Sequence, residues 1–330
     1  MNLEQLTGFA MIAELGHFTR AAERLHLAQP SLSRQVATLE RELGVELFHR
    51  VRGNVTLTAA GERLLPIARR MLADADTARD EMAELAGLRR GRIRLGATPT
   101  LCTSLVAEVL AEYRARYPGI DIEILERGSR SLIAALVEGG LDLALIVTSV
   151  SPEGARAVLE REPILRERLV VVSSAGRADP FGVGAGAGAG ASEGAAAEAE
   201  APVSLAQLAA VPQVVFPENY DLRVAMDAAF GAAGLTPAVA VQGAEMDAAL
   251  SFAERGIGVA VVPAMVAVGR PMLRATPLMS PVGGVELTRT ISIARRSDMV
   301  PTHAAAAMQS LVREIADRLA ALEHGLVTRV

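Results

Sequence analysis

One stretch of the chain, residues 18–43 (FTRAAERLHLAQPSLSRQVATLEREL), constrains the fold more than any other. It predicts a short helix over residues 19–25, a tight turn over residues 26–28 and a second helix that opens with Pro30. Pro30 is expected at the first helical position, where its missing N–H costs no hydrogen bond. Gly44 should end this helix, because glycine readily adopts the left-handed conformation found there.

The second predicted helix has one apolar and one polar face. The apolar residues recur at steps of four, three and four, as a buried stripe requires: Leu32, Val36, Leu39 and Leu43. The polar residues lie on the opposite face: Ser31, Arg34, Gln35 and Thr38. In the major groove of DNA, arginine suits guanine, glutamine suits adenine, and small hydroxyls suit bases or phosphates. The pattern indicates a helix-turn-helix that reads DNA, although a helical hairpin with a solvated polar face fits it too.

A basic hairpin is predicted directly after these helices, over residues 45–58 (VELFHRVRGNVTLT). Two β-favouring runs meet there at Gly53-Asn54, which is a hairpin signal. Arg50 and Arg52 precede the turn. A hairpin beside a recognition helix is a wing, and we expect its arginines to lie along phosphates.

The segments FTRAAERLHLAQPSLSRQVATLERELGVELFHR and VTLTAAGERLL resemble the LysR-type transcriptional regulators. The resemblance implies a winged helix-turn-helix that binds double-stranded promoter DNA. On the matching positions, the expected DNA contacts are Gln29, Pro30, Ser31, Ser33, Arg34, Gln35, Thr38, Arg50 and Arg52. The chain departs from the family at Ala28, where members often carry a capping serine, so Gln29 is expected to cap the helix instead.

A long helix is predicted after the wing, capped by Thr58 and extending to about residue 88. Its apolar residues continue at steps of four and three: Leu64, Ala68, Met71, Ala75, Ala78, Met82 and Leu85. Such a seam favours pairing with a second chain, antiparallel as the family resemblance implies. A dimer would bring two recognition helices to two half-sites. The alternative is a helix that packs on its own domain.

The rest of the chain alternates between strands and helices. In the first set the predicted elements are strand 92–95, a helix from residue 98, strand 120–125, helix 131–137 and strand 141–147. This order predicts a parallel sheet with right-handed crossovers. A second set begins near residue 164, with strands 169–173, 214–216 and 237–241, helices 221–233 and 245–255, and the apolar run 256–263. Strand 287–294 and a C-terminal helix should return to the first sheet.

The motifs GRIRLGATPT, LERGSRSLIAALVEGGLDLALIV and ERGIGVAVVP resemble the LysR family's effector-binding domain, which is two-lobed and periplasmic-binding-protein-like. The expected fold class is thus a multidomain α+β chain. Its expected parts are a winged helix-turn-helix (1–58), a linker helix for dimerisation (59–90) and an effector domain (91–330) with lobe 1 over 91–163 and 270–330 and lobe 2 over 164–269. The Gly/Ala-rich residues 182–202 depart from the family and predict a surface loop without a function.

Ligands of open α/β sheets bind beyond the carboxyl ends of strands, and two-lobed folds bind them between the lobes. This rule selects, from the first lobe, Thr98, Pro99, Thr100, Gly128, Ser129 and Thr148, and from the second, Phe216, Asn219, Glu245 and Met246. The family's effectors contact the same loops. Thr100 and Ser129 have an alternative role as helix caps. Arg127 and Arg130 either face a carboxylate or lie on a solvated rim.

Composition excludes several other classes of protein. The formal charge is −5, so any DNA affinity must arise from local placement of charge. A single cysteine, Cys102, fits a reducing cytosol. It lies in a helical first turn, where the macrodipole would favour the thiolate, and it is expected to be structural or incidental. We see no signal peptide, and the longest apolar run (258–269) is too short to cross a bilayer, so a soluble cytoplasmic protein is expected. The histidines form no ligand cluster and no cofactor motif is present, so no metal or cofactor is expected.

The sequence therefore predicts a transcriptional regulator rather than an enzyme. Its expected partners are promoter DNA, an unidentified small-molecule effector, RNA polymerase, and further copies of itself in a dimer or homotetramer. Cleft closure by the effector would change how dimers pack and so change the spacing of the DNA-reading heads, with a coupling of about 1–3 kcal/mol. Two rival classes are a solute-binding protein, which needs export, and an enzyme on the two-lobed fold, which needs convergent catalytic groups in the cleft.

Overall fold

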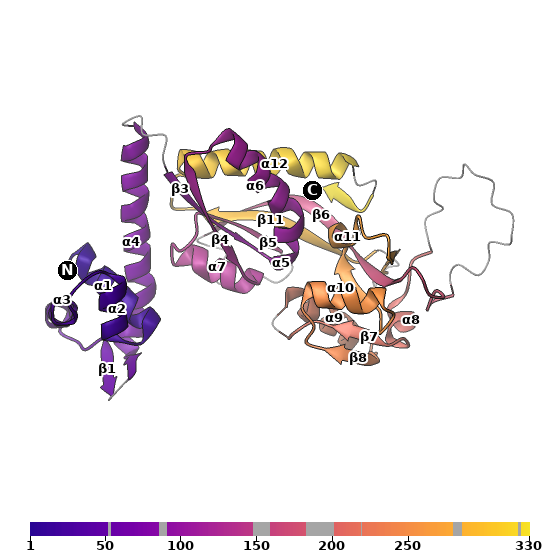
Figure 1. Cartoon of the computed structure of the whole chain (residues 1–330), viewed down its shortest axis with the longest axis horizontal. Coiled ribbons are helices and arrows are strands. Elements are labelled where there is room, and N and C mark those ends of the chain that lie inside the picture. The colour runs from indigo at the N-terminus through magenta and orange to yellow at the C-terminus, as the bar shows by residue number, and fades with distance from the viewer. Residues whose placement is uncertain are drawn as a thin grey trace.

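A computed structural model shows three successive parts: a small helical N-terminal part, one long helix, and two α/β lobes (Figure 1). It describes residues 1–51, 54–85, 91–147, 159–182, 201–218, 220–279, 286–322 and 325–330, without the side chains of residues 50, 51, 54, 80 and 83–85. Within these ranges, no helix combines the length and apolar character that crossing a membrane requires.

The N-terminal part is a winged helix-turn-helix. It consists of α1 (Leu3–Leu15), α2 (Phe18–Arg24), α3 (Gln29–Leu43) and a hairpin of β1 (Phe48–Val51) and β2 (Asn54–Leu57). The side chains of Leu6, Phe9 and Ile12 from α1 pack on Leu32 and Val36 from α3 in a single core. Their burial holds α3 against α1 and leaves the opposite face of α3 at the surface.

The turn between α2 and α3 falls where the sequence predicts it. His26 has a φ of 54°, in the left-handed region, and the Leu27 N–H donates to the Ala22 carbonyl at 2.9 Å. Gly44, with a φ of 73°, ends α3 as expected.

Three details of α3 differ from the prediction. The helix begins one residue earlier, so Pro30 occupies the second helical position rather than the first. Ala28 is the N-cap and makes no side-chain cap, while the Gln29 amide donates to Ser33 Oγ at 3.2 Å; the predicted capping role of Gln29 is therefore wrong. Leu43 is 39% exposed and not part of the buried stripe, because it lies in the last turn, beyond the residues that pack on the core.

The long helix α4 (Ala59–Leu85) is preceded by Thr58, which caps it as predicted. Thr58 Oγ1 accepts a hydrogen bond from the Gly61 N–H at 3.1 Å, which satisfies one of the free donors of the first turn. Along its length α4 docks on the first lobe through ion pairs Arg69–Glu138 (2.6 Å) and Asp74–Arg296 (2.9 Å).

Close approach of the first lobe to α4 depends on a glycine. Gly139 has a φ of 74°, and a Cβ atom placed there would lie 2.8 Å from the Cβ of Ala73 on α4. A larger residue at this position would therefore strain the backbone and push the lobe away from the helix.

The first lobe is built on parallel strands, as the alternation predicts. Strand β3 (Gly91–Ala97) lies between β4 (Ile120–Glu126) and β5 (Leu143–Val147), parallel to both. The connecting and covering helices are α5 (Pro99–Leu101), a π-helical turn η1 (Cys102–Val106), α6 (Ala107–Arg116), α7 (Ser129–Val137) and the C-terminal α12 (His303–Leu322). The Tyr113 hydroxyl on α6 donates to the Ala304 carbonyl on α12 at 2.9 Å, which ties these helices together over the sheet.

One long strand, β6 (Leu159–Ser174), runs through both lobes. Residues 159–168 of β6, except Ile164 at an irregularity, pair with β11 (Thr288–Arg296) in the first lobe. Part of this stretch also pairs with β12 (Val327–Arg329). Its last residues pair with β9 (Ala260–Pro263) and β10 (Leu273–Pro277) in the second lobe. The sheet order is thus β10-β6-β11-β5-β3-β4, with β9 and β12 also on β6.

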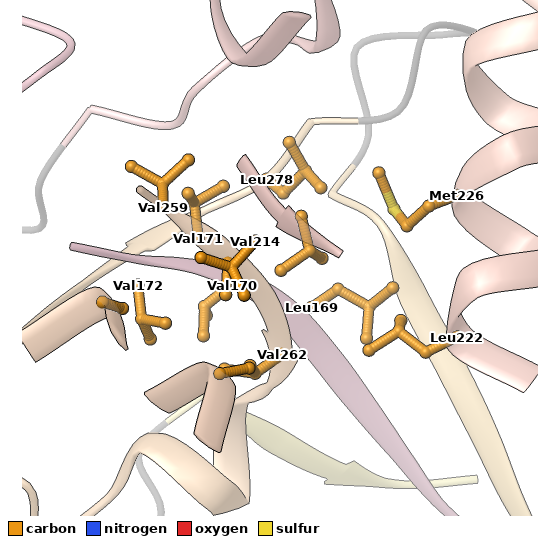
Figure 2. Packing of buried hydrophobic residues seen from close by; sticks show 14 of the residues in the cluster. Leu169, Val170, Val171, Val172, Val214, Leu222, Met226, Val259, Val262 and Leu278 are labelled. Carbon is orange, nitrogen blue, oxygen red and sulfur yellow. The ribbon is translucent and has the colours of Figure 1, made fainter. Parts of the chain in front are cut away.

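The second lobe packs around the end of β6. Its remaining elements are α8 (Leu205–Ala209), β7 (Gln213–Val215), α9 (Asp221–Ala232), β8 (Val239–Gln242), α10 (Met246–Glu254) and α11 (Ala264–Ala267). Figure 2 shows Leu169 and Val171 of β6 among Val214, Leu222 and Leu278 in the apolar core of this lobe.

The chain returns to the first lobe later than predicted. Residues from about 270 were expected there, but Leu273 and Leu278 belong to the second lobe's core. Strand β10 is the reason, since it pairs with the second-lobe end of β6 over Val170–Ser174.

A buried ion pair joins β6 to β11 where the lobes meet. Glu167 is fully buried, and one of its oxygens lies 2.7 Å from Nη2 of Arg289, which is 8% exposed. The other carboxylate oxygen accepts the Met265 N–H at 2.8 Å. Removing one partner of such a pair leaves an uncompensated charge in the interior.

Glu167→Ala should therefore lower the free energy of unfolding by about 3–5 kcal/mol, because it leaves the Arg289 guanidinium buried without a counter-ion. Urea-induced unfolding measures this loss. The matched control is Glu160→Ala on the same strand: Glu160 pairs with Arg295 but is 52% exposed, so the loss should be about 0–1 kcal/mol. Equal losses in the two variants would contradict the prediction.

Candidate DNA-binding surface and interlobe cavity

The first half of α3 is a polar surface. Gln29, Pro30 and Arg34 are exposed, and the Arg34 Nε donates to the Pro30 carbonyl at 3.2 Å, which leaves its two terminal nitrogens at the surface. Ser31 and Ser33 are half-buried beside them. The predicted polar face is therefore accessible at the helix N-terminus, where backbone N–H groups also favour phosphate.

Gln35 and Thr38 lie further along the same face and are half-buried. The Oε1 of Gln35 is buried and has no hydrogen-bond partner in the described part of the chain. Thr38 Oγ1 accepts a hydrogen bond from Arg41 Nη2 at 3.4 Å. These residues are thus more constrained by their neighbours than Gln29 and Arg34 are.

The wing is the hairpin that the sequence predicts. Arg50 pairs with Val55, and Val51 with Asn54, across antiparallel β1 and β2. The side chain of Arg50 and all of Arg52 lie outside the described residues. Their contact with phosphates therefore stays a prediction.

The apolar seam of α4 divides into two sections. Ala68 is fully buried in the core of the winged helix-turn-helix and Leu64 packs on that core, so for these two residues the alternative of packing on the same domain holds. Further along, Met71 is 37% and Met82 is 58% exposed. Ala75 is half-buried, Ala78 is exposed, and the Leu85 side chain lies outside the described residues.

A cavity of about 210 Å³ lies between the two lobes. First-lobe residues that line it are Thr98, Pro99, Thr100, Glu126, Arg127, Gly128, Val147 and Arg289, and second-lobe residues are Tyr220, Asp221, Leu222 and Glu245. Of the residues predicted from the sequence, Thr98, Pro99, Thr100, Gly128 and Glu245 meet here.

The other predicted effector residues lie elsewhere or outside the described residues. Phe216 and Met246 are buried in the second lobe's apolar core and do not line the cavity. Phe216 directly follows β7 and Met246 is the first residue of α10, and both side chains pack in this core instead of facing the other lobe. Thr148 and Asn219 fall outside the residues that the structure describes.

The threonine hydroxyls at the cavity are not helix caps. Thr98 is the N-cap residue of α5 but makes no side-chain cap. The Thr100 Oγ1 lies 3.3 Å from that of Thr98 and accepts a hydrogen bond from Arg289 Nη1 at 2.9 Å. The capping alternative is therefore wrong for Thr100, whose hydroxyl joins the buried ion pair to the cavity wall.

Ser129 links the lobes instead of capping its helix or lining the cavity. Its Oγ accepts the Val147 N–H at 3.0 Å, which fixes α7 against β5. Its own N–H donates to Asp221 Oδ2 of the second lobe at 2.9 Å. The capping alternative is wrong here too, and the main chain of one lobe is held directly by a carboxylate of the other.

Two titratable groups near the cavity have raised pKa values. Burial raises the pKa of Tyr220, and the hydrogen bond that its hydroxyl donates to Glu245 adds to the effect. The Tyr220 ring also stacks on Phe216, with centroids 5.4 Å apart.

Burial raises the pKa of Cys102 to about 11, with a further contribution from the charge of Glu126. A thiolate is therefore not favoured at Cys102, because burial and the nearby negative charge both disfavour the ionised form.

Sequence reasoning missed the residues that reach the cavity from distant parts of the chain. Arg289 comes from β11 through strand pairing that no local pattern reveals. Tyr220 and Asp221 lie at the start of α9. The rule that ligands bind beyond the carboxyl ends of strands selected only the residues directly after β7, which end just before Tyr220. Glu126 and Val147 are the last residues of β4 and β5, so the same rule extended by one residue would have found both.

Cys102 should be a poorly reactive thiol. Raising its pKa from 9.0 to about 11 lowers the thiolate fraction at pH 8 by about a hundredfold. Alkylation by iodoacetamide should therefore be slow, and its rate should still rise between pH 9 and 10.5. Urea-unfolded protein is the control and should react as an ordinary cysteine does. A rate for the folded protein that levels off near pH 9 would show that burial does not control this thiol.

Comparison with known proteins matches both ends of the chain. Residues 3–62 match the family described as "Bacterial regulatory helix-turn-helix protein, lysR family", and residues 86–317 match "LysR substrate binding domain". The HTH-type transcriptional regulator IlvR of Caulobacter vibrioides is 30% identical over 324 residues, which cover 96% of this chain and 98% of that protein.

The fold is that of solved full-length regulators. CbnR, a LysR family transcriptional regulator, matches with a TM-score of 0.64 and 25% identity over 96% of this chain and 99% of its own. CbnR complexed with its target DNA matches with a TM-score of 0.61 and 24% identity, over the same shares of the two chains. The chain belongs to the LysR family of DNA-binding transcriptional regulators, and its two C-terminal lobes are that family's effector-binding domain.

Proposed function

We propose that this regulator binds promoter DNA as an oligomer through α3 and the wing, and that a small molecule in the interlobe cavity modulates this binding. The observation that carries the proposal is the combination, in one chain, of an exposed polar N-terminal half of α3 with a cavity between the lobes that residues of both lobes line. DNA and effector thus have separate sites, as an allosteric regulator requires.

Sequence readout is assigned to the accessible face of α3. Arg34 carries a guanidinium suited to guanine, and Gln35 an amide suited to adenine. Gln29, Pro30, Ser31, Ser33 and Thr38 position the helix against bases and phosphates, and Arg50 and Arg52 of the wing hold phosphates. Because the chain carries a formal charge of −5, affinity depends on these local contacts and on the pairing of two chains.

Oligomer formation is assigned to the exposed section of the α4 seam. Met71, Ala75, Ala78 and Met82 form a stripe at heptad spacing, of which Met82 is 58% exposed in the single chain. Burying such a stripe against a second copy removes apolar surface from water. Two dimers would then assemble into a homotetramer on DNA, where the regulator meets RNA polymerase in the cytoplasm.

Effector control is assigned to the contacts between the lobes. The hydrogen bond from the Ser129 N–H to Asp221 lies at the edge of the cavity, so a ligand that changes the interlobe angle must lengthen or strengthen it. Coupling between two such sites typically amounts to about 1–3 kcal/mol, so effector should shift DNA binding rather than abolish it.

Arg34→Ala should reduce discrimination between operator and scrambled DNA by about 1–3 kcal/mol, the worth of a bidentate contact to guanine. Fluorescence anisotropy with both duplexes at the same salt concentration measures the specificity ratio. The matched control is Arg41→Ala, which removes the same charge from the last turn of α3, about 10 Å along the helix axis.

The control should weaken binding to both duplexes alike and keep their ratio. If Arg34→Ala also kept the ratio, Arg34 would not read bases and the assignment of α3 would fail. If both variants bound as the unmodified chain does, neither charge would lie near DNA.

Met82→Glu should weaken self-association at least about tenfold, or about 1.4 kcal/mol, because it places a charge in an apolar contact. Sedimentation equilibrium of the full chain measures this change. Met272→Glu is the control, since Met272 is equally exposed, at 58%, but lies in the second lobe, away from α4. Equal association of the two variants would exclude the α4 seam as the interface.

A further inference from the structure

The charged side chains around the interlobe cavity are predominantly acidic. Among its described lining residues, Glu126, Asp221 and Glu245 carry carboxylates, and Arg127 and Arg289 carry guanidinium groups. Arg289 is already neutralised by the fully buried Glu167, 2.7 Å away. A ligand in this cavity therefore meets three negative charges against one uncompensated positive charge, that of Arg127.

Two of these carboxylates line the same cavity from opposite lobes. Glu245 of the second lobe accepts the hydrogen bond of the Tyr220 hydroxyl, and Glu126 of the first lobe is close enough for its charge to help raise the pKa of that phenol. The side chains of Glu126 and Glu245 are both exposed to solvent. Like charges that face one another across a cleft repel, and the repulsion grows as the cleft closes and water leaves.

The first-lobe wall offers one hydroxyl hydrogen-bond donor to a ligand. Thr100 Oγ1 accepts a hydrogen bond from Arg289, which can only donate. The hydroxyl hydrogens of Thr98 and Thr100 must therefore find other acceptors. One of them serves the contact of 3.3 Å between the two oxygens. For the second hydroxyl hydrogen, the described residues supply no acceptor, so an oxygen of a ligand in the cavity can accept it.

We propose that the cavity takes a small organic ligand that carries an ammonium group between Glu126 and Glu245, and an oxygen acceptor against Thr98 and Thr100. The proposal rests on the function proposed above, in which this cavity is the effector site. The positive group removes the repulsion between the two carboxylates and so favours the closed arrangement of the lobes. A dianion of the same size gains the threonine donor but must bring its second charge against Glu126 and Glu245.

A bare metal ion fits the site less well than an organic cation. The described residues hold no group of three or more histidine, cysteine, aspartate or glutamate side chains arranged to hold a metal. Glu245 is also already engaged by Tyr220, and Asp221 by the Ser129 N–H. An ammonium group, which donates hydrogen bonds in several directions, needs only the remaining lone pairs of these carboxylates.

Isothermal titration calorimetry of the full chain with three probes of equal carbon number tests this inference. The probes are 1,5-diaminopentane, 5-aminopentanoate and pentanedioate, each in buffer with EDTA to exclude metal ions. The two amines should bind, with 5-aminopentanoate tighter because it also supplies an acceptor. Pentanedioate should bind at least tenfold more weakly than 5-aminopentanoate.

Charge-removing variants locate the binding. Glu245→Gln and Glu126→Gln should each weaken amine binding at least tenfold, and both residues are exposed, so folding should be unaffected. The control is Glu123→Gln on β4, the strand that also carries Glu126, because the Glu123 side chain is 58% exposed, lies 3.6 Å from Arg92 and does not line the cavity. This variant should bind the amines as the unmodified chain does.

Three results would overturn the inference: tighter binding of pentanedioate, amine binding that survives both glutamate variants, or no amine binding at millimolar concentration. Specific DNA binding, measured on the same protein without any probe, separates this failure from failure of the proposed function. Preserved operator binding with a preference for pentanedioate rejects only the ammonium ligand. Loss of operator specificity rejects the regulator itself.

Discussion

The buried pair of Glu167 and Arg289 is the interaction on which the effector-binding domain most depends. Glu167 stands on β6 close to the point where this strand passes from one lobe to the other, and it accepts the Met265 N–H of α11. Arg289 extends this hydrogen-bond network to the cavity wall, where it donates to the Thr100 hydroxyl. Because neither charge can be left unpaired in the interior, the pair fixes the register of β11 against β6 and the position of the cavity hydroxyls together.

The interlobe cavity and the surface of α3 differ in charge. The overall excess is acidic, with a formal charge of −5, and the cavity is acidic as well. The surface of α3 instead presents Arg34 beside neutral polar groups, and α4 lies between that surface and the lobes (Figure 1). Ion pairs join α4 to the first lobe, so the helix that carries the DNA-binding part also contacts the effector-binding domain.

Local patterns in the sequence predict local structure well in this protein. The turn at His26, the end of α3 at Gly44 and the start of α4 at Thr58 follow from residue preferences over a few positions. The same holds for Thr98 and Thr100, which follow a predicted strand and reach the cavity. What fails depends on packing between distant segments: Leu43 extends past the core, and Ala68 is covered by its own domain.

The sequence could not predict which residues reach the cavity through the pairing of distant strands. Arg289 becomes a cavity residue only because antiparallel β11 lies beside β6, and β10 joins the second lobe only because it pairs with the far end of that strand. The acidic character of the cavity likewise emerges from side chains on β4, α9 and the residue preceding α10 that meet in space. No spacing rule along the chain connects these positions.

The most direct test of the central claim is the specificity of DNA binding by the full chain. Binding to a duplex selected from a random pool and to its scrambled version is measured at two salt concentrations, together with a footprint on the selected duplex. The account predicts two protected half-sites and a specificity ratio that persists when added salt weakens both affinities. Equal affinity for the two duplexes at both salt concentrations would contradict it.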